Sequence, residues 1–143
     1  MARMTEFLDV AIAAAQVAGR VHRYYADADK QVGTKANFAD IVTKVDRLSE
    51  ERIREVLNGA FPDHAVLGEE AGEQGAAGAT HRWIVDPLDG TTNYAARFPF
   101  YCVSVALEVE GVVEVGVVLD TVRDRLYTAM RGKGARVDGA PLA

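Results

Sequence analysis

The chain has 143 residues, 49% hydrophobic and 26% charged, a balance typical of one globular domain and unlike that of a disordered chain. Its apolar runs are too short to span a bilayer and no signal-peptide pattern is visible, so we expect a cytoplasmic protein without a membrane partner. The net charge of −5 argues against nucleic acid as a general partner, because such binding depends on Lys and Arg. The single cysteine, Cys102, excludes an internal disulfide, and nothing in the sequence marks it as a nucleophile.

The first part of the sequence predicts two helices. Apolar residues recur three and four positions apart over residues 5–25, which is typical of one buried helical face. A polar segment follows, and then a second helix is predicted within residues 43–62, with Pro62 marking its end. Thr43 and Asp46 match a capping box at its start. We therefore interpret Asp46 as a capping residue and leave it out of any functional site.

Short β-type runs follow, separated by turns that contain glycine. In the longest run, alternate apolar residues should face the two helices, while residues 71–80 are predicted to form a mobile loop. The pattern indicates an α+β fold, in which two N-terminal helices pack on a mainly antiparallel sheet within one domain, residues 1–143. The predicted strands are residues 64–67, 82–85, 101–109, 112–120, 125–130 and 135–138.

Carboxylates follow two of the predicted strands. Glu69 and Glu70 come after the first run, and Asp86 and Asp89 come after the second. If these strands are neighbours, four carboxylates converge at one edge of the sheet, where they repel one another unless cations are bound. Such hard oxygen ligands suit Mg²⁺. A solvated acidic turn or a helix cap is a sufficient explanation for either pair alone, whereas the two pairs together favour a site.

The residues directly after the second acidic pair favour phosphate binding. Gly90 and Thr91 lie where a short helix begins, and the free backbone N–H groups at such a position hold phosphate well. The Thr91 hydroxyl is also placed beside the carboxylates, where it can orient an attacking water. An N-cap role for Thr91 is the simpler alternative, and the two roles are compatible.

Five stretches together carry a resemblance to a known family. The chain resembles the inositol monophosphatase family of Mg²⁺-dependent, lithium-sensitive phosphatases over nearly its whole length. The stretches are "ADIVTKVD" at 39–46, "GEE" at 68–70, "WIVDPLDGTTNY" at 83–94, "FPFYCVSVAL" at 98–107 and "GKGARVDG" at 132–139.

The resemblance implies a metal site. Its ligands would be the side chains of Glu69, Asp86 and Asp89 and the backbone carbonyl of Leu88, with Asp86 bridging two ions. Mg²⁺ would be the natural ion, Mn²⁺ a substitute and Li⁺ an inhibitor.

The resemblance also implies catalytic roles. The N–H groups of Gly90 and Thr91 would hold the phosphate, and the Thr91 hydroxyl, linked to Asp40, would help to activate the water. Glu70 would support the metal ligands, and Lys35 would lie on a loop that closes over the site. For the other aromatic and imidazole side chains we expect ordinary roles: surface positions for His22, His64 and His81, and packing for Trp83, Phe98, Phe100 and Tyr101.

The family has a second half with a "WD" motif that completes one metal site. No such motif occurs here, since Trp83 is followed by Ile84. We therefore expect the chain to be an N-terminal lobe with little activity of its own. The expected parent is a homodimeric phosphatase that hydrolyses inositol monophosphate or a similar small phosphate. Histidinol phosphate, fructose 1,6-bisphosphate and 3′-phosphoadenosine 5′-phosphate are alternative substrates, and a non-catalytic metal-binding or dimerisation module is the alternative of another class.

Overall fold

The computed structural model describes residues 3–32 and 38–142. Two long helices, α1 (Met4–Val32) and α2 (Phe38–Ala60), come first, and a short helix, α3 (Thr91–Ala95), separates β3 from β4. The strands are β1 (Ala65–Gly68), β2 (Gly72–Gln74), β3 (His81–Asp89), β4 (Cys102–Val109), β5 (Val112–Asp120), β6 (Arg125–Met130), β7 (Ala135–Val137) and β8 (Ala140–Pro141).

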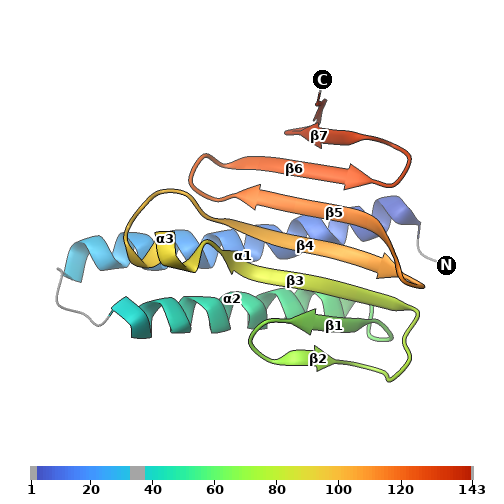
Figure 1. Cartoon of the computed structure of the whole chain (residues 1–143), viewed down its shortest axis with the longest axis horizontal. Coiled ribbons are helices and arrows are strands. Elements are labelled where there is room, and N and C mark those ends of the chain that lie inside the picture. Colours follow the sequence, from blue (N-terminus) through green and yellow to red (C-terminus); the bar gives the residue numbers. More distant parts are fainter. Residues whose placement is uncertain (1–2, 33–37, 143) are drawn as a thin grey trace.

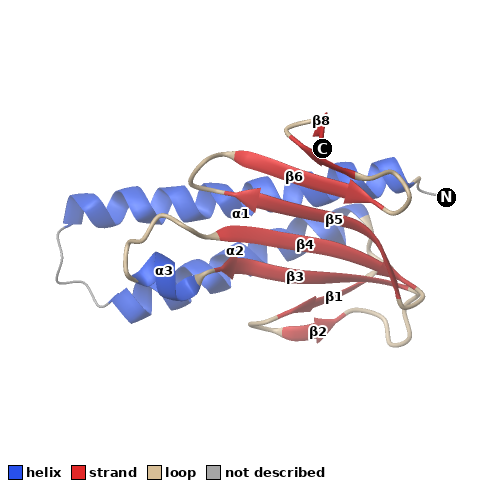
Figure 2. Ribbon diagram, turned by 45° about the horizontal axis from the view of Figure 1, so that its top comes forward, coloured by secondary structure: helices blue, strands red, loops and turns tan. Residues whose placement is uncertain are grey.

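The strands form one sheet in the order β2-β1-β3-β4-β5-β6-β7-β8. β1 and β3 are parallel, and the other neighbouring strands are antiparallel. Both long helices lie on the same face of this sheet (Figures 1 and 2). The predicted α+β fold, with two helices packed on a mainly antiparallel sheet, is confirmed.

The main core lies between the helices and the sheet. Val103, Val105 and Leu107 alternate along β4 and are buried, as their spacing predicts. α1 presents a face of small side chains that lets it lie close to the sheet. At Gly19 on this helix, even a Cβ atom would come within 2.7 Å of Leu119 in β5. The buried α1 residues of the core are Phe7, Ala11, Ala14, Ala15 and Ala18.

Two boundary predictions are wrong. α2 begins at Phe38, so Thr43 lies inside the helix and the proposed capping box does not exist. Asp46 is instead a buried residue in the helix interior. Residues 71–80 are not all loop, because β2 pairs antiparallel with β1, with Val66 opposite Gln74. The glycine-rich composition hid this edge strand, whose backbone is stabilised by pairing and not by its own side chains.

His22 is fully buried, so its predicted surface position is wrong. Its Nε2–H donates to the Pro87 carbonyl oxygen at 2.8 Å, and its Nδ1 accepts from the Thr121 hydroxyl at 3.0 Å. Burial lowers the pKa of His22 to about 4. The hydrogen bond to Pro87 raises this pKa in part, and the positive charge of Arg23 lowers it further. This neutral imidazole joins α1 to the segments after β5 and inside β3.

The remaining aromatic predictions divide. Trp83 is buried and Tyr101 is half-buried, as expected for packing residues. The packing role predicted for Phe98 and Phe100 is wrong, because their side chains are 57% and 59% exposed on the loop between α3 and β4. Both residues precede β4, which begins at Cys102, close to the start predicted for this strand.

His64 and His81 are half-buried and stack on each other at 4.5 Å between ring centroids, so their surface assignment is also wrong. Trp83 Nε1–H donates to Nδ1 of His64 at 3.0 Å. The rings of Phe7 and Phe61 complete this cluster at the far end of β3 from α3. Burial and the neighbouring His81 lower the pKa of His64 to about 4.

The face of the sheet turned away from α1 and α2 is open in the described part of the chain (Figure 2). Val118 of β5 and Tyr127 of β6 are paired on neighbouring strands there, and each is more than a third exposed. Neither α1 nor α2, nor the short α3, has the length and apolar character to cross a membrane.

The buried histidine makes stability depend on pH. Because the pKa of His22 falls from 6.5 to about 4 on folding, the unfolded chain binds more protons between these values, and acid favours unfolding. We expect this residue alone to remove about 2 kcal/mol of stability between pH 7 and pH 5. Urea unfolding of His22→Asn should therefore show a weaker loss over that range than the unmodified chain. An equal loss in both proteins would contradict a neutral His22.

Candidate metal and phosphate site

The two acidic pairs are brought together by the one parallel strand pair. β1 lies beside β3 with Gly68 opposite Val85, so both chains run toward the same edge of the sheet. The next residue along each chain is Glu69 and Asp86, respectively. The two strands are therefore neighbours, which is the condition under which the sequence predicts that the carboxylates converge.

A bulge in β3 places Asp86 and Asp89 on one face. Residues three apart in a regular strand point to opposite faces. Here Asp86 pairs with Ser104 and Asp89 pairs with Cys102, which are only two residues apart in β4. The bulge therefore absorbs one residue and keeps both carboxylates on the same side, as bulges beside functional sites commonly do.

The residues inside the bulge are anchored. The Leu88 side chain is buried against Val45 of α2 and Tyr94 of α3. The Pro87 carbonyl accepts the hydrogen bond from His22. The backbone around the predicted Leu88 carbonyl ligand is therefore held from both long helices.

The carboxylates strongly influence one another. Burial raises the pKa of Asp86 to about 6, and the charges of Glu69 and Asp89 add to this rise. Burial also raises the pKa of Asp46 to about 7, with contributions from Glu70, Asp86 and other nearby acids. The parallel pairing of β1 with β3 and the bulge in β3 bring these carboxylates together, and the pKa shifts agree with this arrangement. We refer to the set as the acidic group, which comprises Asp46, Glu69, Glu70, Asp86 and Asp89.

Asp46 is the member of this group that sequence reasoning missed. One signal was available, because Asp46 lies beside Val45 and four residues before Glu50 on the helix face that becomes buried. An acid on a buried helix face needs a partner or a cation. Asp40, the predicted partner of Thr91, is exposed near the start of α2, and no hydrogen bond joins the two among the described residues.

The donor set suits a divalent cation. Oδ1 of Asp46 and Oδ1 of Asp86 are buried and lack a hydrogen-bond partner among the described residues. Unpartnered, ionisable oxygens in an acidic group are what a hard cation such as Mg²⁺ neutralises. Within residues 3–32 and 38–142, no three acidic, His or Cys side chains already enclose a common point at metal-ligand distance. Binding would therefore have to draw the exposed Glu69 and Asp89 side chains inward.

The predicted phosphate-binding residues lie immediately after the bulge. Gly90 has φ 98°, in the left-handed region, and a Cβ there would come within 3.0 Å of the Phe100 carbonyl oxygen. Glycine is therefore required on both conformational and steric grounds. Thr91 begins α3 directly after it. The predicted loop residue Lys35 lies outside the described residues.

Cys102 borders the acidic group without being reactive. Its thiol lies 3.8 Å from Oδ2 of Asp89 and donates to it. Burial, followed by the charge of Asp89, raises the pKa of Cys102 to about 12. The thiol therefore stays protonated, which agrees with the expectation that it is not a nucleophile.

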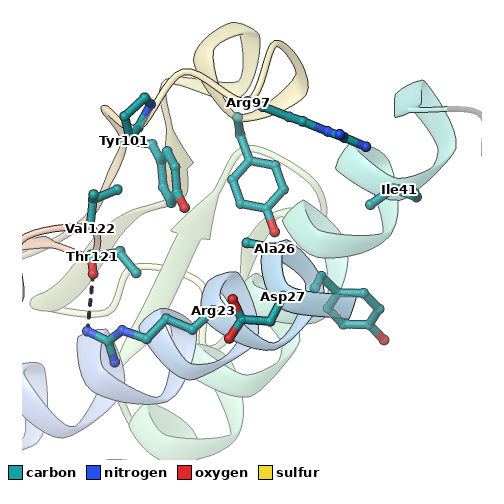
Figure 3. A pocket seen from close by; sticks show the side chains of 11 residues that line it. Arg23, Ala26, Asp27, Ile41, Arg97, Tyr101, Thr121 and Val122 are labelled. Atoms are coloured by element: carbon teal, nitrogen blue, oxygen red, sulfur yellow. Dashed lines mark hydrogen bonds between the residues drawn. The ribbon is translucent and has the colours of Figure 1, made fainter. Parts of the chain in front are cut away.

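A separate cavity of about 350 Å³ lies between the end of α1, the start of α2 and the loop after α3 (Figure 3). Arg23 donates to the Thr121 carbonyl oxygen at 3.3 Å on one side, and Arg97 extends toward α2 on the other. None of the predicted metal or phosphate residues lines it. Its walls are Arg23, Tyr25, Ala26, Asp27, Ile41, Tyr94, Arg97, Pro99, Tyr101, Thr121 and Val122.

This combination of fold and acidic turns has known counterparts. The model of the inositol monophosphatase family matches residues 3–143. The chain belongs to the inositol monophosphatase family. Among curated family members, Nus factor SuhB of Pasteurella multocida is 42% identical over 140 residues, which cover 97% of this chain and 52% of that protein. The chain thus spans about half the length of the curated relatives that it matches.

Solved structures of inositol monophosphatases agree with the fold. The enzyme from Anabaena is 37% identical with a TM-score of 0.83, over 97% of this chain and 49% of that one. A structure of SaIMPase-II with inositol monophosphate bound is 30% identical with a TM-score of 0.74, over 96% of this chain and 48% of that one. A structure of inositol monophosphatase II from Staphylococcus aureus is also 30% identical, with a TM-score of 0.83 over 98% of this chain and 52% of that one.

The acidic group should destabilise the metal-free chain at neutral pH. The pKa of Asp86 is raised from 3.8 to about 6 on folding, so between about pH 4 and pH 6 the folded chain binds more protons than the unfolded chain. Stability is therefore lost as the pH rises from about 4 to 6. In EDTA at pH 7, we expect Asp86→Asn to raise the free energy of unfolding by about 1 to 2 kcal/mol, after allowance for solvent screening. The gain should vanish near pH 4 in urea unfolding. The exposed Asp9→Asn is the control, and an equal gain there would refute the explanation.

Proposed function

We propose that the chain supplies the metal- and phosphate-binding lobe, residues 1–143, of a Mg²⁺-dependent phosphomonoesterase that acts on inositol monophosphate or a related small sugar or alcohol phosphate. The observation that carries the proposal is the convergence of the Glu69–Glu70 turn with the Asp86–Asp89 bulge, directly before Gly90 and Thr91. The inositol monophosphate found in SaIMPase-II supports this substrate class.

The residues of the chain have distinct tasks in this proposal. Glu69, Asp86, Asp89 and the Leu88 carbonyl would hold Mg²⁺, with Mn²⁺ as a substitute and Li⁺ as an inhibitor. A bound Mg²⁺ would neutralise the phosphate and make water a stronger acid. This role requires the carboxylates to be ionised, which the ion itself favours by offsetting their mutual repulsion.

Thr91 would orient the attacking water through its hydroxyl, and its N–H, with that of Gly90, would hold the phosphate. We assign the α2 carboxylate of the site to Asp46 in place of Asp40, because Asp46 lies within the acidic group and Asp40 is exposed. Glu70 or Asp46 would accept one proton from the water as its oxygen bonds to phosphorus and the bond from phosphorus to the ester oxygen breaks. The ester oxygen would take that proton back and leave as the alcohol.

A second candidate has its own support. The curated relatives bear the name Nus factor SuhB, which favours a binding role that needs no turnover. In that case the acidic group would be a structural metal site in a non-catalytic module. A cytoplasmic homodimer without nucleic acid as a direct partner stays our prediction for either function.

Metal binding is the first step to test. We expect Mn²⁺ or Mg²⁺ to raise the melting temperature of the chain, because cation binding removes the repulsion among the carboxylates. At about 100 times the Kd, the gain in stability is roughly 2.7 kcal/mol. Calorimetry should show that Asp86→Asn loses most of the shift and that Asp9→Asn keeps it. A shift that survives in Asp86→Asn would remove Asp86 from the site.

Turnover should be measured on a protein that spans the full length of the relatives and contains this chain, with phosphate release from inositol monophosphate and the alternative substrates. We expect Thr91→Ala to lower kcat by about 10² to 10⁴ with little change in metal affinity, since the hydroxyl acts on the water in the transition state. Thr92→Ala, whose side chain is exposed on the same helix, is the matched control. Phosphate release by neither the unmodified protein nor any variant would favour the binding module, and near-normal kcat in Thr91→Ala would leave Thr91 as a helix residue only.

A further inference from the structure

α2 carries a buried ion pair whose purpose is not explained by packing. Nε of Arg54 lies 3.2 Å from Oε2 of Glu50, one helical turn away, and both side chains are more than nine-tenths buried. Taking two charges out of water costs several kcal/mol per ion unless further hydrogen bonds satisfy them. Both Glu50 and Arg54 make further hydrogen bonds of this kind.

Glu50 binds the turn that carries the predicted metal ligand. Its Oε1 accepts from the backbone N–H of Glu70 at 2.9 Å, and its Oε2 accepts from that of Ala71, also at 2.9 Å. Hydrogen bonds to an ionised carboxylate are stronger than those between neutral groups. The contact is so close that a Cβ on Gly68 would come within 2.2 Å of Oε1.

Arg54 binds both strands that flank the same turn. It donates through Nη1 to the Val66 carbonyl of β1 at 3.1 Å and through Nη2 to the Gly72 carbonyl of β2 at 2.5 Å. The planar guanidinium thus fixes the two strand ends relative to each other while it holds Glu50. A lysine, with one ammonium group, cannot make this set of contacts.

We propose that Glu50 and Arg54 are positioning residues that hold the β1–β2 turn, and with it the carboxylates of Glu69 and Glu70, against Asp86 and Asp46. The inference rests on the proposed function for metal binding, and it adds the residues that hold the metal-binding turn in place. Without the pair, the turn would be a three-residue connection to a short edge strand, whose exposed acids would be driven away from Asp86 by like-charge repulsion.

The test uses Glu50→Gln, which keeps the size of the side chain but removes its charge. We expect Mn²⁺ affinity, followed by electron paramagnetic resonance, to fall about 10- to 100-fold, as is usual when the support of a metal ligand is removed. Amide hydrogen exchange at Glu70 and Ala71 should accelerate in the metal-free protein, while exchange at Val103 in β4 stays slow. Glu55→Gln is the matched control, because Glu55 pairs with Arg52 on the exposed side of the same helix and its loss removes the same charge.

Gly68→Ala is the second variant, and it keeps every charge but displaces the Glu50 carboxylate. It should reproduce both effects, and it keeps the test open if Glu50→Gln does not fold. Faster exchange at Glu70 with unchanged Mn²⁺ affinity would overturn positioning and leave a structural clamp. Loss of affinity equal to that of Glu55→Gln would also overturn it. If the unmodified chain binds no Mn²⁺, the proposed function fails, and the positioning of metal ligands fails with it, whereas Mn²⁺ binding that is equal in the unmodified chain and both variants overturns the inference alone.

Discussion

Electrostatic repulsion among the carboxylates at the ends of β1 and β3 is the constraint on which the rest of the site depends. Asp46 and Asp86 each have a raised pKa because burial and their acidic neighbours disfavour ionisation. A protein relaxes such strain by spreading the charges apart unless its backbone prevents it. The fold keeps these carboxylates together through buried polar contacts to two segments, the bulge in β3 and the turn after β1.

Both long helices contribute buried polar side chains to that task. From α1, His22 donates to the Pro87 carbonyl inside the bulge of β3. From α2, Glu50 accepts from the backbone N–H groups of Glu70 and Ala71 after β1. In both cases the helix binds backbone atoms and leaves the neighbouring carboxylates free to bind something else. The helices are thus more than a hydrophobic cover for the sheet.

One face of the sheet is open in the described part of the chain, and the matched relatives are longer than this chain. α1 and α2 cover one face, while Val118 and Tyr127 are exposed on the other. The matched relatives are about twice as long as the stretch that this chain covers.

Local spacing in the sequence determined the two helices, most of the strands and the acidic motif, because periodicity and turn residues act over a few positions. The parallel pairing of β1 with β3, which brings Glu69 and Asp86 together, was only a condition at the level of the sequence. Alternation along β4 predicted its buried apolar face, but only tertiary structure decided which polar side chains are buried. α2 begins at Phe38, which places Asp46 in the helix interior and Asp40 near the exposed start. The packing of α1 buried His22, while Phe98 and Phe100 stayed exposed on the loop before β4. The burial of a polar side chain and the pairing of distant strands depend on elements far apart in the chain, so local spacing alone does not determine them.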